Sequence, residues 1–189
     1  MKDETSRPSG SGVRLTRERW IEAAMEILGL HGIDGVRVEQ VAKALSVTKG
    51  SFYWHFKDRD ELLEAILEHW RRKNTVDILE YVGSLESPLA RLERLVRLPF
   101  HLQDTDPVGL PLRLWARHDE RARKALQEVD ELRLRMKAQI FIACGFAPEE
   151  ARARAVLLYS YMRVAPTLVE LEDMPLRDLC ERLLLASAA

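Results

Sequence analysis

The chain has 189 residues, of which 47% are hydrophobic, so it can form one or two small domains with a buried core. Its formal net charge of −1 excludes a protein that is basic throughout. No apolar run reaches the length of a membrane span, and residues 1–13 lack the apolar core of a signal peptide, so we expect a cytoplasmic protein without membrane segments.

The predicted elements are all helical, because apolar residues recur at helical spacing and no strand-like alternation occurs. Residues 1–13 are rich in Ser, Gly, Pro and charge and are expected to form a disordered arm. The first helix should begin after Thr16, a plausible cap, run to about Leu30 and stop at Gly32. Further helices are expected at 38–45, 48–56, 58–82, 87–102, 110–118, 119–144, 148 to near Pro166, and 175–186, about nine in all.

Residues 38–56 carry the most informative pattern of the chain. Apolar residues at i, i+3, i+4 and i+7, starting at Val38, predict one short helix. Ser46 and Val47 interrupt this pattern, and Thr48 is expected to cap a second helix. Two short helices joined by a tight turn form a helix-turn-helix motif. The outward side chains of the second helix carry hydroxyls, an ammonium, a phenol and an imidazole but no carboxylate, which suits phosphates and base edges.

The segment from Thr16 to Leu63 resembles the DNA-binding domain of the TetR family of transcriptional regulators. Its most specific part is VTKGSFYWHFK at residues 47–57, which follows the pattern V-[ST]-K-G-[ST]-[LF]-Y-x-[HY]-F and a basic residue. Ser46 stands where the family usually has Gly, so Ser46 must adopt a positive φ or the turn must adjust. Arg37 replaces the usual Ser or Thr cap and can reach a phosphate instead.

The resemblance implies an all-α protein with two parts. A three-helix helix-turn-helix DNA-binding domain is expected at residues 14–60, with its recognition motif at 37–56. A helical ligand-binding and dimerisation domain is expected at 61–189. Residues 1–57 hold nine Lys and Arg against seven Asp and Glu, whereas 58–189 hold twenty against twenty-three. A mildly basic DNA-binding part on an acidic body limits non-specific binding to phosphates.

The expected contacts with DNA divide into two kinds. Lys49 should contact a guanine and Thr48 a phosphate or base, because they lie at the start of the second helix of the motif. Later residues should bind phosphates irrespective of sequence. The full set expected to bind DNA is Arg37, Thr48, Lys49, Gly50, Ser51, Tyr53, His55 and Lys57.

The body contains large amphipathic or soft side chains on several predicted helices, and these either fill a core or frame an apolar ligand pocket. TetR-like bodies usually enclose such a pocket, so a small apolar or amphipathic effector is expected. Arg163 lies in an apolar segment and can anchor an acidic ligand, face solvent or contact a partner subunit. The candidate ligand-binding residues are Trp70, Phe100, Trp115, Tyr159, Met162 and Arg163.

Apolar residues in the last two predicted helices exceed what a small body needs, so residues 149–164 and 175–186 are expected to form a homodimer interface. The five histidines are scattered, no Cys/His cluster occurs, and no nucleophile or phosphate-loop motif is present. We therefore expect no metal, cofactor or catalysis. The sequence favours a repressor released from a near-palindromic operator by a small molecule. The alternatives are a helical ligand-binding protein without DNA affinity and a constitutive DNA binder.

Overall fold

The computed structural model describes residues 15–83, 87–96, 107–164 and 174–186, without the side chains of 76–83 and 174–175. Regular structure in these ranges is entirely helical, which confirms the all-α prediction. The expected arm at 1–13 and the end of the predicted helix 87–102 lie outside the described residues. The elements are α1 (Arg17–Gly35), α2 (Val38–Ala44), η1 (Lys49–Trp54), α3 (Arg59–Gly83), α4 (Pro88–Val96), α6 (Gly109–Trp115), α7 (Glu120–Ala143), α8 (Pro148–Val164) and α9 (Met174–Leu185).

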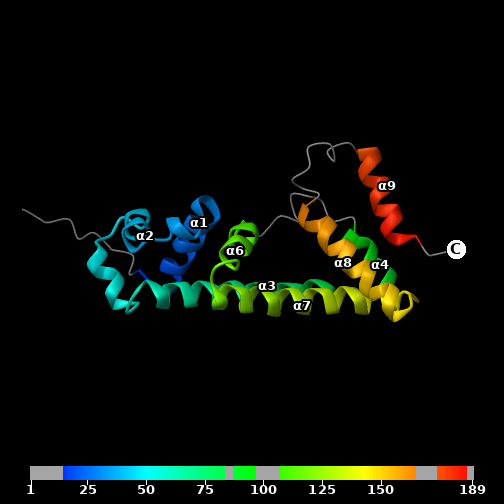
Figure 1. Cartoon of the computed structure of the whole chain (residues 1–189), viewed down its shortest axis with the longest axis horizontal. Coiled ribbons are helices and arrows are strands. Elements are labelled where there is room, and N and C mark those ends of the chain that lie inside the picture. The colour runs from blue at the N-terminus through cyan, green and yellow to red at the C-terminus, as the bar shows by residue number, and fades with distance from the viewer. Residues whose placement is uncertain (1–14, 84–86, 97–106, 165–173, 187–189) are drawn as a thin grey trace, which may run out of the picture.

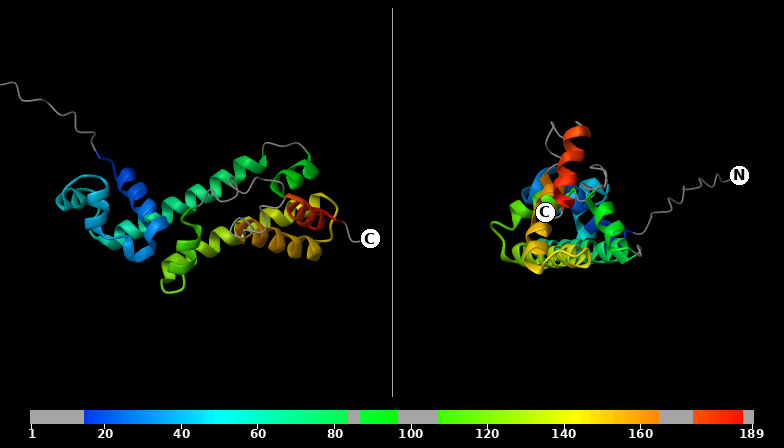
Figure 2. Two further views of the ribbon diagram at one scale, coloured as in Figure 1. Left: turned by 90° about the horizontal axis from the view of Figure 1, so that it is seen from above. Right: turned by 90° about the vertical axis from the view of Figure 1, so that its right-hand side faces the viewer.

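The two longest helices, α3 and α7, lie side by side along the long axis of the molecule (Figure 1). They run in the same direction, because side-chain contacts advance along both chains together, from Asp60–Arg121 to Arg71–Glu128. α1, α2 and η1 occupy one end, α6 packs on α1 near the middle, and α4, α8 and α9 occupy the other end (Figures 1 and 2). α3 therefore connects the amino-terminal helices directly to the body.

The predicted helix starts are correct where side chains cap them. Thr16 Oγ1 accepts a hydrogen bond from the N–H of Arg19 at 3.4 Å. Before α3, Asp58 Oδ1 accepts from the N–H of Glu61 at 2.9 Å, and Glu61 Oε2 accepts from the N–H of Lys57 at 2.8 Å. Such caps satisfy amide groups that have no partner within the helix and stabilise it by about 1 kcal/mol each.

The predicted end of the first helix needs correction. Gly32 does break the helix, with φ 68° and ψ −174°, but helical structure resumes for one further turn to Gly35. The added turn affects packing, because the carbonyl of Ile33 within it and that of Val36, the residue that caps it, accept hydrogen bonds from the Arg59 side chain.

The buried side chains form two clusters. The first joins α1, α2, η1 and the start of α3 to α6 and the first half of α7, and includes Trp20, Phe52, Trp70 and Trp115. It thus continues past residue 60, where the sequence placed the domain boundary. The second cluster joins α4, the end of α7 and α8 around Phe141. Because the first cluster is continuous, a tilt of α6 or α7 would shift the packing of the amino-terminal helices.

Candidate DNA-binding surface and effector site

The turn after α2 is made by a serine in the left-handed region. Ser46 has φ 56°, which is the first of the two alternatives that the sequence left open for a residue in place of glycine. The N–H of Val47 donates to the carbonyl of Ala42 at 2.9 Å, and the N–H of Ser46 donates to that of Lys43 at 3.0 Å. These two bonds are the Schellman pattern that closes a helix, and they fix the direction in which the chain enters η1.

η1 is a 3₁₀ helix rather than the predicted α-helix, and Thr48 does not cap it with its side chain. The N–H of Ser51 bonds the carbonyl of Thr48 at 3.1 Å, and the Ser51 hydroxyl donates to the same carbonyl at 2.8 Å. A 3₁₀ turn bonds i to i+3, so fewer amide groups at its start lack a partner and a side-chain cap is less needed. The Thr48 hydroxyl is thereby left exposed beside the turn.

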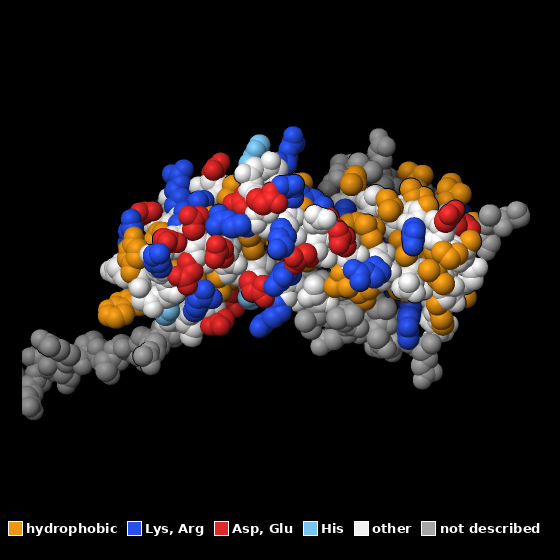
Figure 3. All heavy atoms as spheres, turned by 60° about the horizontal axis from the view of Figure 1, so that its bottom comes forward, with side chains coloured by type: hydrophobic (Ala, Val, Ile, Leu, Met, Phe, Trp, Pro, Cys, Tyr) orange, Lys and Arg blue, Asp and Glu red, His pale blue; other side chains and the backbone are white. Residues whose placement is uncertain are grey.

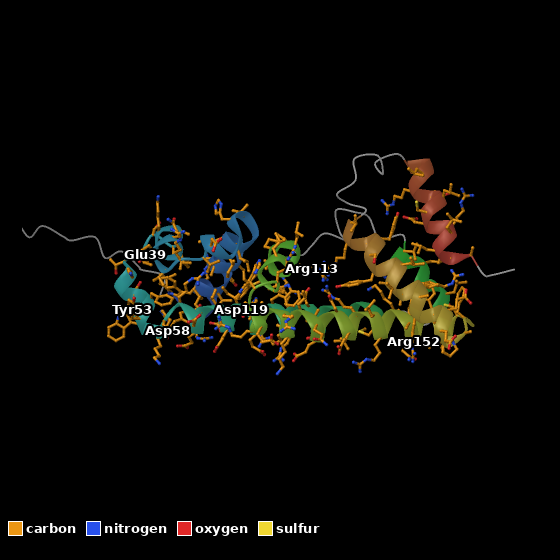
Figure 4. All side chains as sticks on the ribbon, in the orientation of Figure 1. Glu39, Tyr53, Asp58, Arg113, Asp119 and Arg152 are labelled. Carbon is orange, nitrogen blue, oxygen red and sulfur yellow. The ribbon has the colours of Figure 1, made fainter. Side chains whose placement is uncertain are left out.

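Most of the residues expected to bind DNA are exposed on one continuous stretch. We call Arg37 and residues 48–57 the recognition surface. Figure 4 places Tyr53 at the end of the molecule far from Arg152. In this set Ser51 and His55 are half-buried, and the following are exposed: Arg37, Thr48, Lys49, Gly50, Tyr53 and Lys57.

Two cations of the recognition surface have intramolecular partners. Lys49 Nζ forms an ion pair with Glu39 of α2, and this contact raises the pKa of Lys49 and lowers that of Glu39. Arg37 Nε donates to the carbonyl of Asp34 at 3.0 Å and makes no cap bond to α2. Lys49 is therefore oriented by a carboxylate that phosphates would compete with.

The recognition surface is supported by an aromatic core. Phe52 is fully buried, meets Trp20 edge-on at 5.5 Å and stacks on Phe56 at 5.3 Å. Arg59 at the start of α3 donates to the carbonyls of Val36 at 2.6 Å and of Ile33 at 2.9 Å. The direction of α3 is thus tied to that of the helix-turn-helix, so a rotation of α3 would carry the recognition surface with it.

Sequence reasoning missed two features of this surface. The side chain of Trp54 is 87% exposed, which is unusual for a tryptophan. The sequence could have indicated this exposure. Trp54 lies two residues from each of the buried residues Phe52 and Phe56, which places it on the opposite face of the helix. The other feature is Glu39, whose pairing with Lys49 depends on how the turn folds and has no local sequence signal.

Ion pairs link the start of α7 to the start of α3. Arg121 lies 3.2 Å from Asp60 and 3.6 Å from Glu64, and it also contacts Asp119, the cap of α7, at 2.9 Å. The hydrogen bond from Arg121 lowers the pKa of Asp119 to about 2, although partial burial of this carboxyl opposes the shift. These contacts join the start of α7 to the start of α3, the helix that follows the recognition surface in the chain.

The predicted ligand-binding residues fall into separate places. Trp70 and Trp115 are buried in the first cluster, whereas Met162 packs against the second. Tyr159 and Arg163 lie together, with the Arg163 guanidinium 5.3 Å from the centre of the Tyr159 ring. Phe100 lies outside the described residues. Four hollows lined by described residues, one of them of about 350 Å³ beside Val156, do not include Trp70, Trp115 or Tyr159.

Tyr159 is the centre of a half-buried polar cluster in the body. Its hydroxyl donates to Asp130 Oδ1 at 2.5 Å and accepts from Arg113 Nη2 at 3.0 Å. Arg113 also holds both oxygens of Asp130, at 2.8 and 2.9 Å. Burial raises the pKa of the Tyr159 hydroxyl, and the bond to Asp130 raises it further, so this group stays protonated.

Two further cations from α7 complete the polar cluster. Arg133 Nη1 lies 3.5 Å from the Tyr159 hydroxyl, and Arg133 Nη2 donates to the Asn74 side chain of α3. Lys137 Nζ lies 5.4 Å from the centre of the Tyr159 ring. The sequence held a signal for both cations, because Val129, Arg133, Lys137 and Phe141 recur every four residues along one buried stripe.

Large apolar side chains are exposed on the two carboxyl-terminal helices. Figure 3 shows hydrophobic side chains gathered at one end of the molecule, whereas charged side chains cover the other half of the same face. A folded monomer seldom leaves so many large apolar side chains in water. Those exposed on α8 and α9 are Val156, Leu157, Val164, Leu176, Leu179 and Leu183.

The described residues contain neither a cluster of metal-ligating side chains nor a membrane-spanning helix. No group of three or more His, Cys, Asp or Glu side chains lies close enough to hold a metal ion. Among the same residues, no helix combines the length and the apolar character that crossing a bilayer requires.

The chain is similar in sequence to known bacterial transcriptional regulators. Residues 21–66 match the family model for bacterial regulatory proteins of the tetR family. The chain is 36% identical over 78 residues to TtgW, an uncharacterized HTH-type transcriptional regulator of Pseudomonas putida, across 41% of this chain and 58% of that one. It is 27% identical over 157 residues to the HTH-type transcriptional regulator AcrR of Shigella flexneri, across 81% of this chain and 62% of that one.

The fold is also similar to solved structures. The transcriptional regulator FadR of Bacillus subtilis, solved in complex with stearoyl-CoA, superposes with a TM-score of 0.65 at 16% identity. The superposition covers 92% of this chain and all of that chain. At this identity the likeness concerns the fold alone. The sequence matches span less than two thirds of the length of both TtgW and AcrR.

Proposed function

We propose that this chain, which belongs to the TetR family of bacterial regulatory proteins, is a dimeric transcriptional repressor that a small-molecule effector releases from DNA. The observation that carries the DNA-binding part is the recognition surface. It offers exposed ammonium, hydroxyl and phenol groups on a short helix that a tight turn and an aromatic core hold in place. Groups of this kind bind phosphates and the base edges of a major groove.

The expected division of roles fits the geometry. Lys49 and Thr48 stand at the start of η1 and are proposed to contact bases, or a base and a phosphate. Arg37, Tyr53, His55 and Lys57 flank that start and are proposed to bind the phosphates on either side. Gly50 and Ser51 would allow close approach of the backbone, since Gly50 has no side chain to separate η1 from DNA.

A homodimer is proposed on the exposed apolar faces of α8 and α9. One short recognition helix contacts only a few base pairs, so pairing two subunits multiplies specificity. The apolar face lies at the end of the molecule away from the recognition surface, which leaves both recognition surfaces of a dimer free to contact DNA (Figures 1 and 4).

Release by an effector is proposed to act through α3 and α7. A ligand in the body that favours another tilt of these helices would change the spacing of the two recognition surfaces, which must match major grooves about 34 Å apart. The continuous first core and the Arg121 ion pairs offer a physical route for that coupling. The complex of FadR with stearoyl-CoA supports the idea that a body of this fold can hold a small molecule.

Selection from a pool of random DNA duplexes with the full chain tests this function. The expected product is an inverted repeat whose half-sites lie about one helical turn, or a multiple of it, apart. A compound that raises the thermal stability of the protein should then weaken its binding to that duplex. Stabilisation without release would indicate a constitutive DNA binder. Failure to enrich any sequence would indicate a ligand-binding protein without specific DNA affinity.

A further inference from the structure

Two cations interrupt the buried stripe of α7. Arg133 and Lys137 are 7% and 8% exposed, although their neighbours on the stripe, Val129 and Phe141, are fully buried apolar residues. The two cations lie four residues apart, so they share one face of the helix and repel each other. Removing an ion from water is costly unless an opposite charge and hydrogen bonds replace the water.

Within the part of the chain that the structure describes, few groups offset these charges. Asp130 is the nearby carboxylate, but Arg113 occupies both of its oxygens. Among the described residues, neither Arg133 nor Lys137 has a carboxylate within ion-pair distance, and Arg133 Nε has no hydrogen-bond partner. Arg163 adds a third cation beside the Tyr159 ring, also without an ion pair in the described ranges.

The contacts that the described residues make with Arg133, Lys137 and Arg163 do not neutralise the positive charge of these side chains. Lys137 and Arg163 rest near the Tyr159 ring at 5.4 and 5.3 Å, and Arg133 is bonded to the neutral side chains of Tyr159 and Asn74. The free energy gained from a cation–π contact or from a hydrogen bond to an amide oxygen is smaller than the free energy that desolvation of an ion costs. Burial, together with the charge of Arg133, lowers the pKa of Lys137 to about 8. The charged form of this lysine is therefore disfavoured where it lies.

We propose that the effector carries an anionic oxygen group, a carboxylate or a phosphate monoester, which binds between Arg133, Lys137 and Arg163 beside Tyr159. This inference rests on the proposed function, because it names the chemical class of the effector. Buried apolar side chains lie on both sides of the polar cluster, with Trp70 in the first core and Phe141 in the second. The ligand class that fits is therefore an amphipathic anion with an apolar body.

The site lies where binding can be transmitted to DNA. Arg133 bonds Asn74 of α3, and Asn74 Nδ2 in turn donates to the carbonyl of Trp70 one turn earlier. An anion that draws Arg133 toward itself competes with this contact between α7 and α3. Because α3 is tied to the helix-turn-helix through Arg59, a changed register between α3 and α7 would move the recognition surface.

The test compares head groups on one apolar tail in thermal unfolding and calorimetric titration of the full chain. The probes are decanoate, decyl phosphate, decan-1-ol and decyltrimethylammonium. Decanoate or decyl phosphate should raise the unfolding temperature and bind at least about tenfold tighter than the other two, and the better of the two identifies the head group. Equal stabilisation by decan-1-ol, or none by either anion, would overturn the proposal.

Variants locate the binding site. Lys137→Met should weaken binding of the better anion by at least about tenfold and raise the unfolding temperature of the ligand-free protein, because it removes an unbalanced buried charge. Lys124→Met, which replaces an exposed lysine of the same helix, should change neither. If Lys137→Met binds the anion as the wild type does, the site is elsewhere and the proposal fails. Lys137-dependent binding without any effect on DNA affinity would keep this inference and contradict the proposed release mechanism.

Discussion

Lys49, the first residue of η1, forms an ion pair with Glu39 of α2 across the turn of the helix-turn-helix. Both side chains are exposed, so the pair is screened by solvent and competes with phosphates for the lysine. The pair therefore orients Lys49 in the free protein and opposes its transfer to DNA.

Replacing Glu39 by Gln should tighten DNA binding. The change removes a carboxylate that holds Lys49 and that would repel nearby phosphates. Loss of an exposed pair of this kind should raise the affinity for DNA about two- to fivefold. Fluorescence anisotropy with the selected duplex measures the effect. Glu68→Gln, which removes an exposed glutamate paired with Arg71 on α3, is the matched control. Unchanged binding by the Glu39 variant would mean that the pair does not compete with DNA, and weaker binding would mean that it helps to present Lys49.

Replacing Ser46 by Gly should stabilise the protein. Ser46 adopts φ 56°, a conformation that disfavours residues with a Cβ atom by about 1 kcal/mol, and glycine removes most of that penalty. We expect the free energy of unfolding to rise by about 0.5–1 kcal/mol in urea denaturation. Gly145 offers the reverse control, since its φ is 98° and Gly145→Ala should destabilise by at least about 1 kcal/mol. A destabilised Ser46 variant would mean that the serine side chain contributes more than its strain.

The stability of the ligand-free protein should depend on pH through Lys137. Burial lowers the pKa of Lys137 from 10.5 to about 8, so below pH 8 the lysine is charged in both states and its destabilising effect is fully present. Between pH 8 and 10.5 the unfolded chain binds a proton that the folded one has lost, so the free energy of unfolding rises with pH, by up to about 3 kcal/mol. Urea denaturation at several pH values should show this rise in the wild type and not in Lys137→Met. Parallel pH profiles would contradict the shifted pKa.

The dimer interface can be tested at Leu183, whose side chain is 66% exposed on α9. Leu183→Glu would place an unpaired charge in the proposed apolar interface, so sedimentation velocity should show a monomer and DNA binding should weaken. Leu30→Glu, at an exposed leucine of α1, should leave the oligomeric state unchanged. A stable dimer of the Leu183 variant would place the interface elsewhere.

Much of the amino-terminal part could be predicted from the sequence, because its signals are local. The sequence narrowed Ser46 to a positive φ or an adjusted turn, and the structure has the positive φ. The caps at Thr16 and Asp58 followed from hydroxyl and carboxylate residues before apolar periodicity. The 3₁₀ geometry of η1 was missed, because the apolar spacings of 3₁₀ and α-helical turns differ too little to be told apart over six residues.

The polar cluster of the body could not be predicted in the same way. The sequence marks Arg163 as unusual and Tyr159 as one of several large amphipathic side chains, but it does not give their partners. The parallel arrangement of α3 and α7 brings Asn74 to Arg133 across 59 positions of sequence. No local pattern specifies that register. Arg133 and Lys137 were visible only as cations on an otherwise apolar stripe, and their burial becomes evident once α8 covers them.

The most direct test of the central claim, that the recognition surface binds a specific DNA sequence, is an anisotropy titration of the selected duplex and a scrambled duplex at about 50 and 200 mM salt. Lys49→Ala should lose about 1–3 kcal/mol per half-site on the selected duplex and little on the scrambled one. Lys57→Ala should weaken both alike and reduce the salt slope by about one, while Lys73→Ala, at an exposed lysine of α3, should change neither. Equal affinity of the wild type for both duplexes, unaffected by Lys49→Ala, would contradict the account.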